Sequence, residues 1–168
     1  ETGHFATLWK VIALELGLDV MFEQGDWRSA VDPDRLETIL KEDTSANIKA
    51  VCIVHNETST AVTSDIGSIR QAMDAANHPA LLLVDTISSL ASLPYHHKRW
   101  GVDVTVGGSQ KGLMLPPGLG LNVVSNKARE AAKSASLPKS YWNWEAIIEA
   151  NGNGFFPYTP PTNLLYGL

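Results

Sequence analysis

Residues 102–120 read VDVTVGGSQKGLMLPPGLG. The first five form a short strand-like run, and residues 107–120 then hold five glycines, two adjacent prolines and one cation, Lys111. Gly and Pro at this density favour a specific irregular backbone over a helix or a strand. The stretch therefore predicts a strand that ends in a structured loop carrying a single lysine.

Lys111 stands among Gly, Leu, Met and Pro residues, which solvate an ammonium group poorly. Desolvation lowers the pKa of a lysine amine and makes it available as a nucleophile toward a carbonyl. An ordinary loop lysine explains this stretch equally well. The choice between the two depends on the rest of the chain.

Strand and helix patterns alternate along the chain. Residues 48–54 and 80–84 are nearly continuous apolar runs, as in parallel strands covered on both faces. Further strands are predicted at 18–22, 102–106 and 120–124. Helices are predicted at 4–16, in a segment that begins at residue 33, at about 65–77, and at 127–134, 141–150 and 162–168. This order predicts an α/β fold with a mostly parallel sheet and helices on both faces.

Composition narrows the class of protein. Of 168 residues, 44% are hydrophobic and 18% charged, which supports a packed domain. The net charge of −5 and the lack of a basic run argue against nucleic acid as a partner, and no apolar segment reaches membrane-spanning length. Cys52 is the only cysteine, so no internal disulfide is possible, and its apolar surroundings predict a buried, inert thiol.

Reactive side chains follow three of the predicted strands. Thr58 comes after the strand at 48–54, Asp85 ends the strand at 80–84, and Lys111 follows the strand at 102–106. Ligands of open α/β sheets bind beyond the carboxyl ends of the strands. Asp85 needs a partner there, because burying an unpaired carboxylate is costly. Either it caps residues 86–89 or it faces a cationic ligand.

Other chemistries find less support. His96 and His97 are adjacent, and adjacent residues rarely chelate one ion, so we expect no metal site. His55 ends a strand and reads as a satisfied core histidine. No Gly-x-Gly-x-x-Gly motif opens a helix, which disfavours a nicotinamide dehydrogenase.

Four segments together resemble the class V pyridoxal-phosphate aminotransferases, in particular the serine–glyoxylate and alanine–glyoxylate branch. They are HNETST at 55–60, VDTISSL at 84–90, GGSQKGLMLPPG at 107–118 and FPYTPPTNLLYGL at 156–168. The resemblance covers nearly the whole chain. It implies the fold type I, aspartate-aminotransferase-like large domain and pyridoxal 5'-phosphate as the cofactor.

The resemblance also implies roles for single residues. Lys111 would link to the cofactor and move a proton, and Asp85 would pair with the pyridinium nitrogen, so that the ring acts as an electron sink. Thr58 would hydrogen-bond the ring's phenolic oxygen, and Gln110 would help to bind the phosphate. Phe5 would stack on the ring. Without the resemblance, Phe5 reads as a core residue and Thr58 as a turn residue or cap.

The last segment implies a second subunit. Thr159 would reach the phosphate of the neighbouring subunit's cofactor, so the resemblance implies a homodimer with shared sites. Phe156 stands where some relatives have a phosphate-binding Tyr and has no hydroxyl, and Tyr158 would take over that contact. Alternatively, Tyr158 and Thr159 only order a loop.

The resemblance places residues 1–168 in the central part of the large domain. An upstream glycine-rich phosphate segment and a C-terminal small domain with a substrate-binding Arg would lie outside them, so we expect little activity from this chain alone. Cytoplasm is the default compartment, and an organelle remains open.

The implied reaction moves an amino group from serine or alanine to glyoxylate or a similar 2-oxo acid. Alternatives are 2-aminoethylphosphonate transamination, cysteine desulfuration, or a catalytically incomplete α/β fragment. Desulfuration is disfavoured, because Gln110 replaces the His usual before the lysine and Cys52 lies inside a strand.

Overall fold

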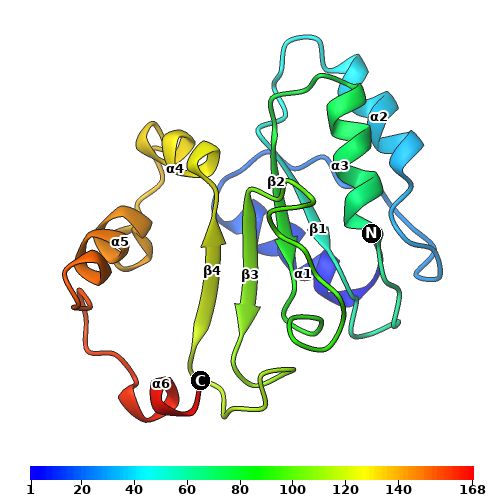
Figure 1. Cartoon of the computed structure of the whole chain (residues 1–168). Coiled ribbons are helices and arrows are strands. Elements are labelled where there is room, and N and C mark those ends of the chain that lie inside the picture. The colour runs from blue at the N-terminus through cyan, green and yellow to red at the C-terminus, as the bar shows by residue number, and fades with distance from the viewer.

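The computed structural model describes all 168 residues and contains one four-stranded sheet (Figure 1). Its strands, in spatial order, are β1 (Ala50–Val54), β2 (Leu81–Asp85), β3 (Val104–Gly108) and β4 (Gly120–Val124). The first three strands are parallel, and β4 runs antiparallel to β3. The predicted mostly parallel sheet is confirmed.

The helices are α1 (His4–Glu15), α2 (Pro33–Glu42), α3 (Ile66–Ala75), α4 (Asn126–Lys133), α5 (Trp144–Gly152) and α6 (Thr162–Gly167), with a short 3-10 turn at Ser140–Trp142. Side-chain caps explain where several of them begin. Asp32 accepts from the N–H of Asp34 ahead of α2, and Asp65 accepts from the N–H of Ser68 in α3. Such caps satisfy N–H groups that have no partner within the helix.

The core lies between the sheet and the pair α2 and α3. It is built from ten buried residues, namely Leu40, Val51, Ile53, Ile66, Ile69, Met73, Ala80, Leu82, Val84 and Val102. Because side chains alternate along a strand, Leu82 and Val84 of β2 enter this core while Leu83 and Asp85 face the other side. The alternation therefore directs Asp85 away from the core.

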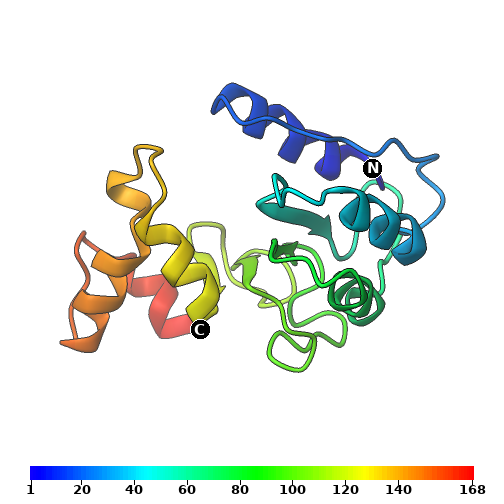
Figure 2. The same cartoon turned by 90° about the horizontal axis from the view of Figure 1, so that it is seen from above.

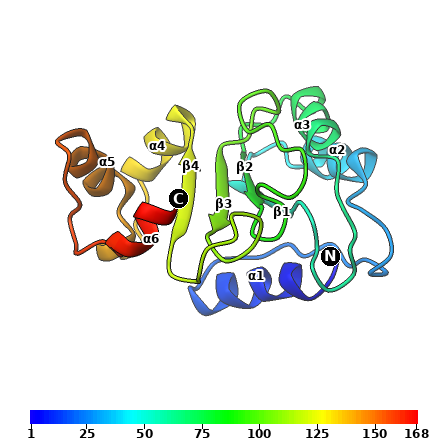
Figure 3. The same ribbon diagram turned by 60° about the horizontal axis from the view of Figure 1, so that its bottom comes forward.

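Helix α1 covers that other side (Figures 2 and 3). None of its residues is buried, although Leu8, Val11, Ile12 and Leu14 are all apolar. The sheet thus has helices on both faces, as predicted, but only the α2–α3 face forms a closed core.

Two expectations about the α1 side were wrong. Residues 18–22 form no strand, since no neighbouring strand is present to pair with them. Cys52 is exposed rather than buried, because it points to the α1 side of β1, at the edge of the sheet. Desolvation by nearby protein atoms still raises the pKa of the thiol to about 11.

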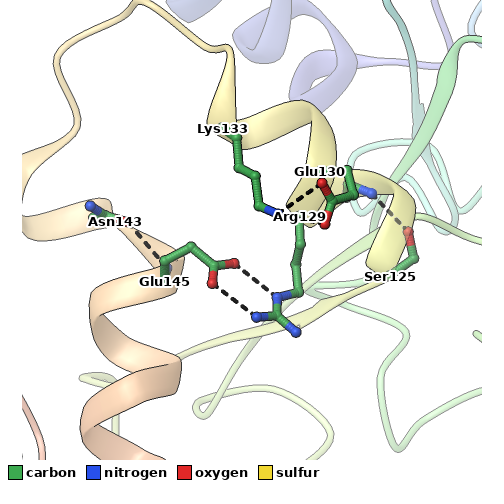
Figure 4. Close-up of polar contacts among 7 residues, drawn as sticks. Ser125, Arg129, Glu130, Lys133, Asn143 and Glu145 are labelled. Carbon is green, nitrogen blue, oxygen red and sulfur yellow. Dashed lines mark hydrogen bonds and ion pairs between the residues drawn. The ribbon is translucent and has the colours of Figure 1, made fainter.

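The segment after β4 lies beside the sheet (Figure 1). Arg129 of α4 and Glu145 of α5 form a bidentate ion pair, with Nε–Oε1 at 2.8 Å and Nη2–Oε2 at 2.9 Å (Figure 4). Asn143 caps α5 through the N–H of Glu145. The α4–α5 pair borders an open cavity of about 440 Å³ whose lining includes Trp142 and Trp144. The Trp142–Trp144 segment therefore lies around this cavity, which Asp85 and Lys111 do not line.

No helix combines the length and the apolar character that crossing a bilayer would require.

Candidate active site

The sheet brings the three predicted strand-end positions to one edge, the one at which the parallel strands β1, β2 and β3 have their carboxyl ends. Val54 of β1 pairs with Asp85 of β2, and Asp85 pairs with Val106 of β3. Thr58 lies in the turn after β1, and Lys111 lies in the loop after β3. Since carboxyl ends of parallel strands share an edge, these residues belong to the same end of the molecule.

Asp85 is a buried carboxylate at this edge that has no cationic partner. Its exposed fraction is 8%, and no Lys, Arg or His lies within ion-pair distance. Burial raises the pKa of its carboxyl, the negative charge of Glu57 adds to this, and hydrogen bonds from Ile87 and Trp9 oppose it. A buried carboxylate without a cation fits a cationic ligand atom.

The contacts of Asp85 include the predicted local cap and a second, tertiary hydrogen bond. Oδ1 accepts from the backbone N–H of Ile87 at 2.8 Å, which is the local capping interaction. Oδ2 accepts from the indole N–H of Trp9 at 3.0 Å. Each carboxylate oxygen has two lone pairs, so both retain capacity for a ligand.

Sequence reasoning missed Trp9. It lies four residues after Phe5 in α1, and residues at this spacing share a helix face. That spacing was the available signal, because a helix that presents Phe5 to the sheet edge also presents Trp9. Phe5 itself is 37% exposed, and its ring meets His4 edge-on at 5.4 Å.

Glu57 was also missed, although it directly precedes Thr58. Its side chain is fully buried and accepts from the N–H groups of Phe5 and Ala6, both 3.1 Å from Oε2, and from the hydroxyl of Ser59. Desolvation opposes ionisation, but these hydrogen bonds outweigh it and lower the pKa of Glu57. The carboxylate therefore stabilises the N-terminus of α1.

Ser109 organises the loop that carries Lys111. Its hydroxyl donates to the carbonyl of Pro116 at 2.7 Å and accepts from the N–H of Leu119, while its carbonyl accepts from the N–H of Leu115. The predicted irregular loop is confirmed. Lys111 itself is exposed, so the expectation that its apolar neighbours in sequence would desolvate it was wrong for this chain.

Two further predicted residues lie around this edge. The side chain of Gln110 folds back over Gly108, where an added Cβ would lie 2.9 Å from its Oε1. Thr58 is exposed in a turn closed by the N–H of Ala61 on the carbonyl of Glu57 at 2.8 Å. Both residues lie in segments that follow the carboxyl ends of β1 and β3.

Tyr158 and Thr159 lie elsewhere. They belong to the segment between α5 and α6, beyond β4 from the edge formed by β1 and β2 (Figure 1). The ring of Tyr158 packs against Tyr141 with centroids 4.7 Å apart, and Thr159 is exposed. Helix α6 nevertheless packs against the loop that carries Lys111. The side chain of Leu164 in α6 lies so close to Gly118 that a Cβ added to this glycine would be only 2.6 Å from it.

The histidines have structural partners. His55 is buried, and its Nδ1 lies 2.9 Å from the hydroxyl of Ser89, as expected of a satisfied core histidine. His97 lies 2.7 Å from the hydroxyl of Thr105, and His96 packs edge-on against Trp100. No group of three His, Cys, Asp or Glu side chains is arranged to hold a metal ion.

Curated proteins that are similar to this chain include glyoxylate aminotransferases. It is 50% identical over 171 aligned residues to the serine–glyoxylate aminotransferase of Methylorubrum extorquens, covering 99% of this chain and 42% of that protein. It is 45% identical to the L-aspartate–glyoxylate aminotransferase of Paracoccus denitrificans, covering 100% and 42%. The chain thus spans less than half the length of these relatives.

Solved structures agree on the fold. The alanine–glyoxylate aminotransferase of Nostoc sp. matches 99% of this chain and 44% of its own with a TM-score of 0.88 at 28% identity. An aspartate aminotransferase of Thermus thermophilus matches 99% and 45% with a TM-score of 0.85 at 29% identity. The α/β architecture is therefore that of the aspartate-aminotransferase-like large domain. Residues 1–144 match the family model described as aminotransferase class-V, and the chain belongs to this family.

Proposed function

We propose that this chain forms the cofactor-binding part of a transaminase that moves an amino group from serine or alanine to glyoxylate or a similar 2-oxo acid. The observation that carries the proposal is the buried Asp85 carboxylate, which has no cationic partner. It lies at the same sheet edge as the loop of Lys111. The class V family implies pyridoxal 5'-phosphate as the cofactor.

The residues present fit this cofactor. Asp85 supplies a desolvated anion for a protonated ring nitrogen, a charge-assisted hydrogen bond of the strong kind. Lys111 supplies an accessible primary amine that can bond to an aldehyde carbon and later carry a proton. Thr58 supplies a hydroxyl for the ring oxygen, Gln110 an amide for the phosphate, and Phe5 an aromatic face. When bound, the cofactor supplies an electron sink for the substrate's amine-bearing carbon.

The choice of substrates rests on the relatives. Their names give serine, L-aspartate or alanine as the donor, and glyoxylate is common to all of them. We place residues 1–168 in the central part of the large domain, with the phosphate segment and the small domain contributed from outside it. We further propose a homodimer in the cytoplasm, in which Thr159 and Tyr158 serve the partner's site.

Cofactor binding by Lys111 is the direct test. The purified protein is incubated with pyridoxal 5'-phosphate, the yellow absorbance is recorded, and borohydride is added to make the link permanent. We expect mass spectrometry to find the pyridoxyl group on Lys111. In the full-length protein, addition of serine should bleach the yellow form before reduction and glyoxylate should restore it, whereas residues 1–168 alone should show little of this exchange.

Lys98→Ala is the matched control, because Lys98 is an exposed lysine in the loop after β2. We expect this variant to keep the yellow form and Lys111→Ala to lose it. A stable label on another lysine in the unaltered protein, or no yellow form at all, would reject the assignment.

A further inference from the structure

Helix α1 is attached to the sheet edge by two carboxylates from neighbouring strands. Glu57, just after β1, binds the N–H groups of Phe5 and Ala6 at the start of the helix. Asp85, at the end of β2, binds the indole of Trp9 one turn later. The helix therefore runs across the ends of β1 and β2 and reaches the proposed nitrogen-binding carboxylate with a side-chain donor.

The contact with Trp9 determines how Asp85 is oriented. A backbone N–H from Ile87 holds Oδ1 and the Trp9 indole holds Oδ2, so the two donors together fix the plane of the carboxylate. Ile87 lies two residues from Asp85 and adds only a local restraint. Trp9 lies 76 residues away and is the tertiary restraint.

We propose that Trp9 is a positioning residue, whose indole N–H orients the Asp85 carboxylate toward the ring nitrogen of the cofactor. The inference rests on the proposed function, because it assigns Trp9 a role toward that same ligand. Trp9 itself does not touch the reacting atoms. It acts through Asp85, and its effect depends on a nitrogen in the ligand ring.

The test compares two ligands on the same variants. One is pyridoxal 5'-phosphate, and the other is its analogue with carbon in place of the ring nitrogen, which cannot pair with Asp85. Dissociation constants are measured by titrating the cofactor-free protein. The variants are Trp9→Phe, which removes the N–H but keeps a ring, and Trp9→His, which keeps a ring N–H. Trp142→Phe is the matched control, since Trp142 is 76% exposed near α5.

We expect Trp9→Phe to weaken binding of pyridoxal 5'-phosphate about tenfold, the effect of losing a hydrogen bond to a charged group. Binding of the carbon analogue should change less than about twofold, and Trp9→His should regain part of the loss. Trp142→Phe should bind both ligands as the unaltered protein does.

Three outcomes for Trp9→Phe would overturn the role of Trp9. Binding of both ligands could weaken equally, which indicates only a damaged helix, or binding of neither ligand could weaken. Binding could also become tighter, which indicates that Trp9 occupies the ligand's place. A different result would overturn the proposed function instead. In that case the unaltered protein binds neither ligand, whatever the variants do.

Discussion

The carboxylate of Glu57 accepts a hydrogen bond from the backbone N–H of Phe5, with Oε2 and N 3.1 Å apart across 52 residues of chain. Through this contact the turn after β1 holds the start of α1. Thr58 follows Glu57, and Phe5 is the donor. The Glu57 carboxylate therefore ties Phe5, which is expected to stack on the ring, to the turn that carries Thr58, which is expected to bond the ring's phenolic oxygen.

Glu57→Gln should destabilise the protein by about 1–2 kcal/mol at pH 7, because a helix N-terminus loses its anion and one amide oxygen replaces two acceptors. The melting temperature should fall by roughly 3–6 °C. Glu15→Gln is the control, since Glu15 is an exposed carboxylate at the other end of the same helix. An equal fall in both variants would contradict the capping role.

The Glu57 contribution should also depend on pH. Hydrogen bonds lower its pKa below the ordinary value of 4.5, so the contribution is present above that value and is lost as the pH falls through the lowered pKa. Thermal melts at pH 7 and pH 3 should show the difference between Glu57→Gln and the unaltered protein shrinking in acid. A difference that grows in acid would reverse the sign and refute the linkage.

Asp85→Asn should weaken binding of pyridoxal 5'-phosphate about tenfold or more, because the neutral amide cannot pair with a cationic nitrogen. In the unaltered protein, burial and the charge of Glu57 raise the pKa of Asp85. Cofactor affinity should therefore begin to fall in mild acid, at a pH above 3.8, as Asp85 is protonated. Titrations of both proteins across this pH range measure the effect, and an unchanged affinity in Asp85→Asn would count against the pairing.

Cys52 should react slowly despite its exposure. With a pKa of about 11, only about one thiol in a thousand is ionised at pH 8, and the thiolate is the nucleophile. Alkylation by iodoacetamide at pH 8 should be about 200-fold slower than for a free cysteine and should rise about tenfold per pH unit. The denatured protein is the control, and a rate that levels off near pH 9 would exclude the raised pKa.

Arg129→Ala should loosen α5 from α4. The two ends of the ion pair with Glu145 are 36% and 42% exposed, so the melting temperature should fall by at most about 3 °C, and less in high salt. Lys133→Ala is the control, because Lys133 forms an exposed ion pair with Glu130 of the same helix and not with α5. Trp fluorescence around the α4–α5 cavity reports the loosening, and an effect that salt does not reduce would argue against an ion pair.

Local sequence determined most of the fold. Asp32 with Pro33 begins α2, Asp65 begins α3, and the apolar runs around Val51 and Leu82 become buried parallel strands. Caps and alternation act over a few residues, so they are readable from the chain. The order of strands likewise predicts that Asp85 and Lys111 follow carboxyl ends at one edge of the sheet.

Only the tertiary structure decided which side chains meet there. Trp9 reaches Asp85 across 76 residues, and Glu57 reaches Phe5 across 52, and no local pattern encodes such distances. The exposure of Cys52 and Lys111 likewise depends on what packs against β1 and the loop after β3, and not on their apolar neighbours in sequence. Residue type and spacing thus specified elements and their ends, while burial and pairing arose from packing between distant segments.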